Sequence, residues 1–234
     1  MRPFPVSGFA SEEPIKATNG DDGSVWLFGL AQSGAEAALS RFDPISGQQA
    51  FFRCPAPLHV SSVAVYFDAV QQAFWASDWR YLLRFNARSH EFNIFRYDTS
   101  LALSRAPAYA LAQTTDGSLW VATEVGLLWA KPQPNGQFTF QLLKNDPQNR
   151  NSLPSNQLKC LLQDPSDGMV LWVGTAGSGL CRFDTRTGAF RHYNTQNGLP
   201  DDVVYGILAE NAQEGQSGSN LWISTNKGLA RFNP

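Results

Sequence analysis

The chain has 234 residues and 43% hydrophobic residues, which is enough to bury a sizeable core. Its net charge of -2 and the lack of any basic run argue against a nucleic-acid partner. No run approaches the roughly 20 apolar residues that a membrane span needs, and the first residues lack the apolar core of a signal peptide. We therefore expect neither a membrane segment nor a leader in this sequence.

Five successive segments share one pattern that is centred on a tryptophan. The tryptophans are Trp26, Trp75, Trp120, Trp172 and Trp222, about 50 residues apart. Asp-Gly precedes the tryptophan at Asp22-Gly23, Asp116-Gly117 and Asp167-Gly168, whereas the second segment has Gln71-Gln72. Asp-Gly supplies the positive φ angles of a tight hairpin turn, so it predicts two antiparallel strands. An Arg-Phe-Asp strand and an outer strand then complete a sheet of four.

Four short strands in about 45 to 50 residues are typical of one blade of a β-propeller. The sequence thus predicts an all-β fold of about five four-stranded blades, over residues 8–53, 54–98, 99–145, 146–194 and 195–234. The recurring tryptophans are expected to pack between blades. The last segment ends after its third strand, and residues 1–7 could supply the fourth and close the ring. The alternative is a piece of a larger ring.

The pattern resembles the two-component regulator propeller repeat. The residues that carry the likeness are Asp-Gly-x-x-Trp-x-x-Thr, then Gly-Leu-x-Arg-Phe-Asp, with Asn197-Gly198-Leu199-Pro200 before the last segment. The resemblance covers nearly the whole chain and implies the sensor part of a bacterial hybrid two-component system that detects oligosaccharides. It also suggests a periplasmic location. Family members usually have seven-bladed rings, a membrane segment and a signalling domain, which this sequence lacks.

Little in the sequence indicates catalysis, so we predict a protein that is not an enzyme, with no catalytic residues, metal or cofactor. Cys54, Cys160 and Cys181 form no Cys-x-x-Cys pair, which argues against a zinc site and a disulfide framework. The three histidines (His59, His90 and His192) are far apart and lack metal-ligand spacing.

Ligand-binding candidates lie in the turns between the second and third strands of each blade. Asp78, Trp79 and Arg80 come first, because an exposed indole can stack on a sugar ring while Asp and Arg bond its hydroxyls. The first segment carries extra residues in the matching turn, among them Gln32 and Glu36. Glu124, Asn226 and Lys227 occupy the corresponding turns of the third and fifth segments.

We therefore predict a ligand-binding sensor module of the two-component type, with a polar ligand such as an oligosaccharide. One alternative is a stand-alone propeller scaffold that binds a protein partner. If the chain is part of a larger ring, additional propeller blades are the expected partners. The other is a propeller enzyme such as a lyase or lactonase, which needs clustered carboxylates, histidines or a metal.

Overall fold

The structure is a computed structural model that describes residues 8–9, 16–31, 36–55, 58–59, 63–101, 103, 105–210 and 220–234. Its described residues form β-strands with two short 3-10 helices, η2 and η3, which confirms the predicted all-β class. By contacts the chain divides into two compact units, Met1–Ala108 and Tyr109–Pro234, which are described separately.

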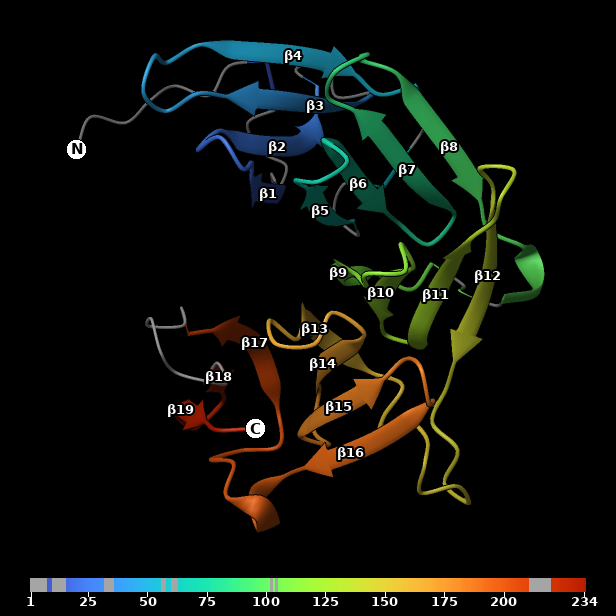
Figure 1. Cartoon of the computed structure of the whole chain (residues 1–234), viewed down its shortest axis with the longest axis vertical. Helices are drawn as coiled ribbons and strands as arrows, with labels where there is room; N and C mark the ends of the chain where they lie inside the picture. The colour runs from blue at the N-terminus through green and yellow to red at the C-terminus, as the bar shows by residue number, and fades with distance from the viewer. Residues whose placement is uncertain are drawn as a thin grey trace. The chain divides into compact units, whose positions relative to one another are not determined.

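The first unit contains two antiparallel sheets whose strands follow chain order (Figure 1). The first sheet consists of β1 (Lys16–Asn19), β2 (Val25–Leu30), β3 (Ala37–Phe42) and β4 (Gln49–Arg53). The second consists of β5 (Ala64–Asp68), β6 (Ala73–Ser77), β7 (Tyr81–Asn86) and β8 (Phe92–Arg96), and η2 (Thr99–Leu101) follows it. Each sheet is therefore a meander, in which every strand pairs with the next one.

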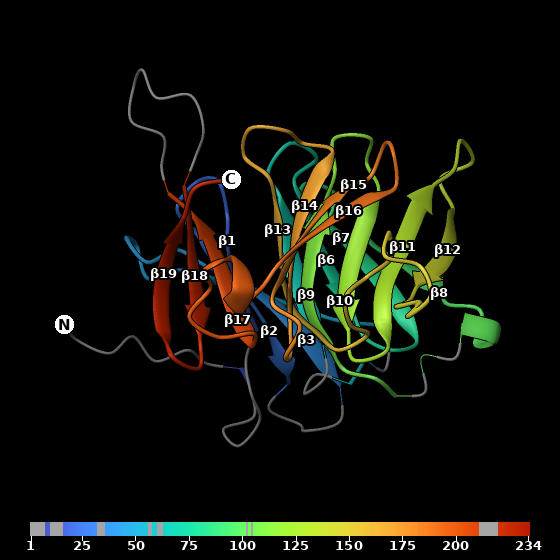
Figure 2. The same cartoon turned by 90° about the horizontal axis from the view of Figure 1, so that it is seen from below.

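The second unit contains the remaining three sheets. One has β9 (Ala108–Gln113), β10 (Leu119–Thr123), β11 (Gly126–Pro132) and β12 (Phe138–Leu143), and the next has β13 (Leu158–Gln163), β14 (Val170–Thr175), β15 (Leu180–Asp184) and β16 (Ala189–Tyr193). After η3 (Thr195–Asn197), the strands β17 (Val204–Ala209), β18 (Leu221–Thr225) and β19 (Gly228–Phe232) form the last sheet. Figure 2 shows these three strands side by side. The predicted set of about five sheets is confirmed, with three described strands in the last one; residues 1–7, expected to complete it, lie outside the described residues.

In each of the first three sheets a residue with a positive φ lies in the turn before the second strand, whereas Gly168 of the fourth sheet has no positive φ, so the prediction for the Asp167-Gly168 turn was wrong. Gly23 and Gly117 have φ angles of 79° and 81°, the left-handed conformation that glycine adopts without steric cost. In the second sheet Gln72 takes this conformation with a φ of 52°. The degenerate Gln71-Gln72 turn thus retains a left-handed residue although the glycine is lost.

Aromatic side chains pack between neighbouring sheets of one unit, as predicted. Trp26 of β2 stacks on Phe67 of β5 with ring centroids 5.5 Å apart, and Trp120 of β10 meets Phe183 of β15 at 5.4 Å. Trp26, Trp75, Trp120 and Trp172 are buried, whereas Trp222 is half-buried. These side chains bury large apolar areas, so they fix the distance between adjacent sheets.

Candidate functional site

The turn that carries Trp79 is built by the carboxylate of Asp78. This turn joins β6 to β7, and Asp78 Oδ1 accepts hydrogen bonds from the backbone N–H groups of Arg80 and Tyr81 at 2.6 and 2.8 Å. Asp78 Oδ2 accepts from the N–H of His59 at 3.2 Å. The Asp78 side chain is buried, so it orders the turn and presents its neighbours rather than facing solvent itself.

The indole of Trp79 is half-buried and is already in contact with two side chains. The His59 ring stacks on it, with centroids 5.7 Å apart and an interplanar angle of 24°. The guanidinium of Arg80 lies 4.8 Å from the Trp79 ring and 5.2 Å from that of Tyr81. These contacts restrict the indole to one orientation, which reduces the entropy that a ligand would lose on ordering it.

Trp79 and Arg80 form one wall of a cavity of about 360 Å³. The other residues that line it lie at the end of β8 and in the segment beyond it: Arg96, Tyr97, Asp98, Thr99 and Leu103. The backbone N–H and the hydroxyl of Ser100 hold the pKa of Asp98 below its usual range, so this carboxylate is charged. The cavity therefore combines an aromatic surface, two guanidinium groups and one carboxylate.

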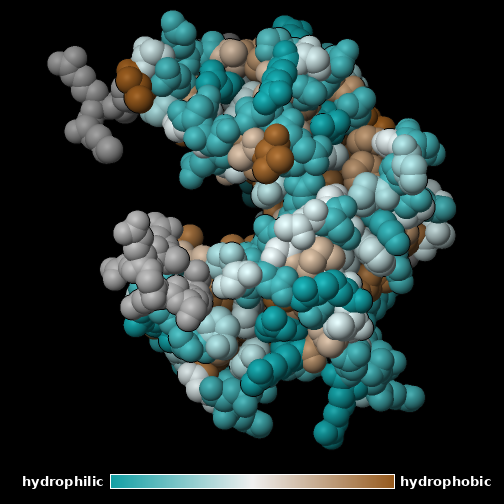
Figure 3. All heavy atoms as spheres, in the orientation of Figure 1, coloured by the Kyte–Doolittle hydropathy of each residue, from teal (hydrophilic) through white to brown (hydrophobic). Residues whose placement is uncertain are grey.

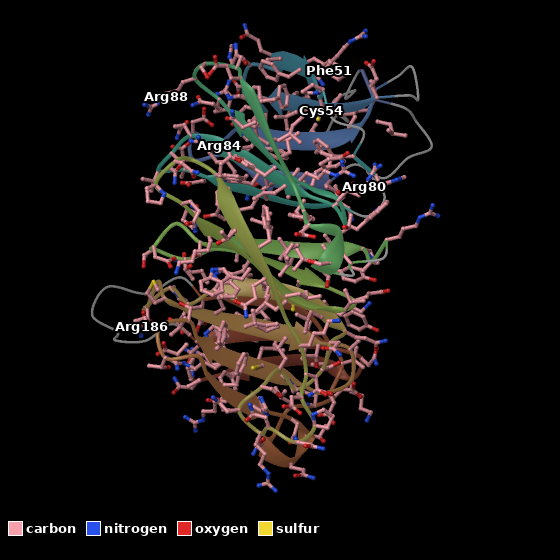
Figure 4. The ribbon with its side chains drawn as sticks, turned by 90° about the vertical axis from the view of Figure 1, so that its right-hand side faces the viewer. Phe51, Cys54, Arg80, Arg84, Arg88 and Arg186 are labelled. Carbon is pink, nitrogen blue, oxygen red and sulfur yellow. The ribbon has the colours of Figure 1, made fainter. Side chains whose placement is uncertain are left out.

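Arg80 stands at one end of the second sheet, and Arg84 and Arg88 lie towards its other end (Figure 4).

The predicted residues Trp79 and Arg80 line the same cavity, whereas Arg96, Asp98 and Thr99, which also line it, were missed by the sequence analysis. Arg96 ends an outer strand and Asp98 precedes a short 3-10 helix, and neither position carries a sequence signal for binding.

The extra residues of the first sheet add less to the candidate site. Gln32 lies outside the described residues. Glu36 precedes β3 and forms an exposed ion pair with Arg53, in which Oε2 is 3.5 Å from the guanidinium. Glu36 is thus placed in the β2–β3 turn as predicted, where it has an ion-pair partner.

A second polar cluster in the other unit contains Glu124. The hydroxyl of Tyr109 donates a hydrogen bond to Glu124, and Lys159 Nζ lies 4.0 Å from the same carboxylate. Lys159 also lies over the Tyr109 ring at 4.2 Å. Burial, together with the hydrogen bond to Glu124, raises the pKa of Tyr109 to about 12.

Asn226 and Lys227 occupy the matching turn of the last sheet. The hydroxyl of Tyr205 donates to Asn226 Oδ1 at 2.8 Å, and Lys227 Nζ lies 3.3 Å from Asp201 Oδ2. Tyr109, Lys159 and Tyr205 share one position, the second residue of β9, β13 and β17. The sequence analysis missed all three. A tyrosine or lysine that recurs at the second position of the first strand of a sheet is a pattern that could have identified them.

The histidines do not converge in the described part of the chain. His59 stacks on Trp79, His90 stacks on Phe85, and His192 Nε2 lies 2.9 Å from the carbonyl oxygen of Ser152. Within the described ranges no three His, Cys, Asp or Glu side chains are grouped as metal ligands would be.

The described ranges contain no helix of the length and apolarity that crossing a membrane requires. On the face shown in Figure 3 the described surface is mainly hydrophilic, with isolated hydrophobic side chains.

Comparisons with solved structures decide the fold. The chain is similar to the extracellular domain of a hybrid two-component system from B. thetaiotaomicron, with 20% identity and a TM-score of 0.66 over 99% of this chain and 30% of that one. It is also similar to virginiamycin B lyase from Staphylococcus aureus, with 14% identity and a TM-score of 0.62 over 95% of this chain and 71% of that one. The fold is a β-propeller. PorZ, a surface component of the type-IX secretion system of Porphyromonas gingivalis, matches with 17% identity and a TM-score of 0.66 over 93% of this chain and 32% of that chain.

No family model and no curated protein matches the sequence. The chain spans about a third of the length of the two-component and secretion proteins that it resembles. The solved structures of similar fold include an extracellular domain of a two-component system and a lyase, so the likeness shows the fold and does not decide a role.

Proposed function

We propose that this chain is the ligand-binding part of a two-component-type sensor, and that the cavity beside Trp79 takes a polar ligand such as an oligosaccharide. The observation that carries the proposal is the composition of this 360 Å³ cavity, whose lining includes Trp79, Arg80, Arg96 and Asp98. The likeness to the extracellular domain of a hybrid two-component system supports the sensor role.

The chemistry of the cavity suits a hydroxylated ring. The apolar face of a sugar can pack on the part of the indole that lines the cavity, since indole combines a large apolar surface with a rigid orientation. Guanidinium groups donate only, and a carboxylate accepts only, so Arg96 and Asp98 recognise opposite ends of hydroxyl dipoles. A volume of about 360 Å³ lies within the usual range of small-molecule sites and holds one or two sugar units.

The experiment is calorimetric titration of neutral oligosaccharides, selected on a glycan array, against the wild-type chain and two variants. Trp79→Ala and Arg96→Ala should each weaken binding about tenfold, because each removes one stacking or charge-assisted contact. Arg88→Ala is the matched control, since Arg88 lies on the same hairpin towards the opposite end from Arg80 (Figure 4). Thermal melting verifies that each variant is folded.

Three outcomes would contradict the proposal. No glycan binds the folded wild-type chain, or Trp79→Ala and Arg96→Ala bind as tightly as wild type, or Arg88→Ala weakens binding as much as they do. The last result would point to a general effect of positive charge rather than to this cavity.

A further inference from the structure

The charged groups that line the cavity beside Trp79 are unequal in sign. Two of them are guanidinium groups, those of Arg80 and Arg96, and one is the carboxylate of Asp98. The carboxylate of Asp78 lies in the adjoining turn, but its side chain is 0% exposed, so a ligand does not reach it. Among the described residues, a ligand in this cavity therefore meets more positive than negative charge.

Arg80 is oriented by its neighbours without being enclosed by them. Its Nε lies 4.0 Å from Asp78 Oδ2, and its guanidinium carbon lies 4.8 Å from the Trp79 ring and 5.2 Å from the Tyr81 ring. The same Asp78 oxygen also accepts from the backbone N–H of His59, so it is shared between two donors. The Arg80 side chain keeps 29% of its surface exposed and is thus ordered but accessible.

The pairing of β7 with β8 brings Arg96 to the same place. Arg96 is directly opposite Tyr81 in the register, and the N–H of Tyr97 donates to the carbonyl oxygen of Arg80 at 2.9 Å. Directly opposite residues of an antiparallel pair have Cβ atoms about 5 Å apart and share one face of the sheet. Because the Arg80 guanidinium already lies over the Tyr81 ring, both arginines flank this tyrosine.

Nothing negative in the described part of the chain pairs with Arg96. No described carboxylate lies within ion-pair distance of its guanidinium, whereas Arg80 has Asp78. Asp98 is charged, but its Oδ1 accepts from the N–H of Ser100 at 2.8 Å. Two neighbouring guanidinium groups repel each other, and an anion bound beside both removes that repulsion. The arrangement therefore favours a ligand that carries a negative group.

The rest of the lining fits a ring rather than a bare ion. The indole of Trp79 offers a large apolar surface beside the arginines, and Leu103 adds to it. Tyr97 is buried, and its hydroxyl lies 2.7 Å from that of Ser77, which fixes this wall. A volume of about 360 Å³ exceeds that of a free carboxylate, so the negative group is expected on a larger molecule.

We propose that the oligosaccharide of this cavity is acidic, and that the carboxylate of a uronic acid unit binds beside Arg80 and Arg96. This inference rests on the proposed function, because it assigns the charge of the ligand in the same cavity. A guanidinium donates two parallel N–H bonds to a carboxylate, and such a pair is stronger than a bond to a hydroxyl. The sugar ring packs on Trp79, and Asp98 accepts from a ring hydroxyl.

The test uses an array of oligosaccharides in matched pairs, each uronic acid beside its carboxyl-reduced counterpart. The two members differ only in a carboxylate against a hydroxymethyl group, so the ratio of their affinities isolates the charge. Calorimetric titration of the wild-type chain with the tightest pair should show at least about tenfold tighter binding of the uronate. This ratio should fall as salt is added, because ions screen the attraction.

Three variants locate the effect. Arg96→Gln should weaken uronate binding about tenfold and that of the reduced counterpart less than about threefold, since the amide still donates to a hydroxyl. Asp98→Asn keeps an acceptor for Ser100 and removes a like charge, so it should strengthen binding of the uronate alone. Arg88→Gln makes the same charge change towards the other end of the sheet and should alter neither (Figure 4). Thermal melting verifies that each variant is folded.

The outcomes separate this inference from the proposed function. If a uronate and its reduced counterpart bind equally tightly, the acidic ligand is wrong while the proposed function stands. Equal losses of uronate affinity in Arg96→Gln and Arg88→Gln would show a general effect of charge and would also overturn the inference. If no member of any pair binds the folded wild-type chain, the proposed function itself fails, and this inference fails with it.

Discussion

The indole of Trp172 donates a hydrogen bond to Asp164 Oδ2 over 2.8 Å, and the two side chains are both buried. Asp164 Oδ1 also accepts from the backbone N–H groups of Ser166 and Asp167, at 2.8 and 3.1 Å. One carboxylate therefore fixes both the tryptophan that packs between two sheets and the turn that leads to it.

Replacing this carboxylate should destabilise the second unit. Asp164→Ala leaves three donors without their acceptor, and we expect a loss of about 3 kcal/mol in the free energy of unfolding. Asp164→Asn keeps one acceptor oxygen and should lose less. Urea denaturation measures both values. If Asp164→Ala lowers the free energy of unfolding as much in a Trp172→Phe background as in wild type, the hydrogen bond to the Trp172 indole does not contribute to the loss.

Two glycines at the start of matching strands should respond differently to alanine. Gly179 and Gly228 have φ angles of +78° and +116°, but a Cβ on Gly179 would lie 2.1 Å from the carbonyl oxygen of Tyr193, whereas a Cβ on Gly228 meets no atom of the described residues within 4 Å. Gly228→Ala should therefore cost about 1 to 2 kcal/mol from its backbone conformation alone. Gly179→Ala adds a clash with β16 and should cost about 3 kcal/mol or more. If thermal denaturation shows equal losses of stability for the two variants, the predicted clash of Gly179→Ala with Tyr193 of β16 is wrong.

Tyr109 should titrate late in the native chain. Burial and the hydrogen bond to Glu124 raise its pKa to about 12, above the ordinary value of about 10. The stability that this shift contributes is present below about pH 10 and is lost as the pH rises towards 12. Glu124→Gln should lower the pKa of Tyr109. Carbon-13 spectra of labelled tyrosine, assigned with Tyr109→Phe, measure it, and an unchanged pKa would remove Glu124 as a cause.

Asp184 should remain charged in moderately acidic solution. Hydrogen bonds from the Arg186 side chain lower its pKa to about 2. Because the folded-state pKa is depressed, the associated stability is present above about pH 4 and is lost as the pH falls towards 2. Arg186→Gln should raise the pKa of Asp184 towards its ordinary value, as followed by carboxyl carbon-13 shifts. Asp43, which is bonded by Ser46 instead, is the control and should not change.

The binding candidates show where the sequence analysis was informative and where it was not. An indole beside an arginine in a turn marked Trp79 and Arg80 as a pair, and the structure brings them together against one cavity. Arg96 and Asp98 join them from another strand, and no pattern along the chain relates those positions. Asp78 was predicted as a ligand-binding residue because of its charge, yet its carboxylate accepts hydrogen bonds from the backbone N–H groups of Arg80 and Tyr81.

The sequence by itself determined the type and order of the strands, because these depend on local properties: a left-handed turn residue such as Gly117, and apolar strands with a tryptophan at a fixed place. Only the tertiary structure decided which polar groups are satisfied. Trp26 and Trp120 look alike in the sequence, and they differ because Thr114 accepts from one indole whereas Gly20 offers nothing to the other. Hydrogen bonding of a buried group depends on atoms that adjacent strands bring within about 3 Å, and residue spacing alone does not encode that distance.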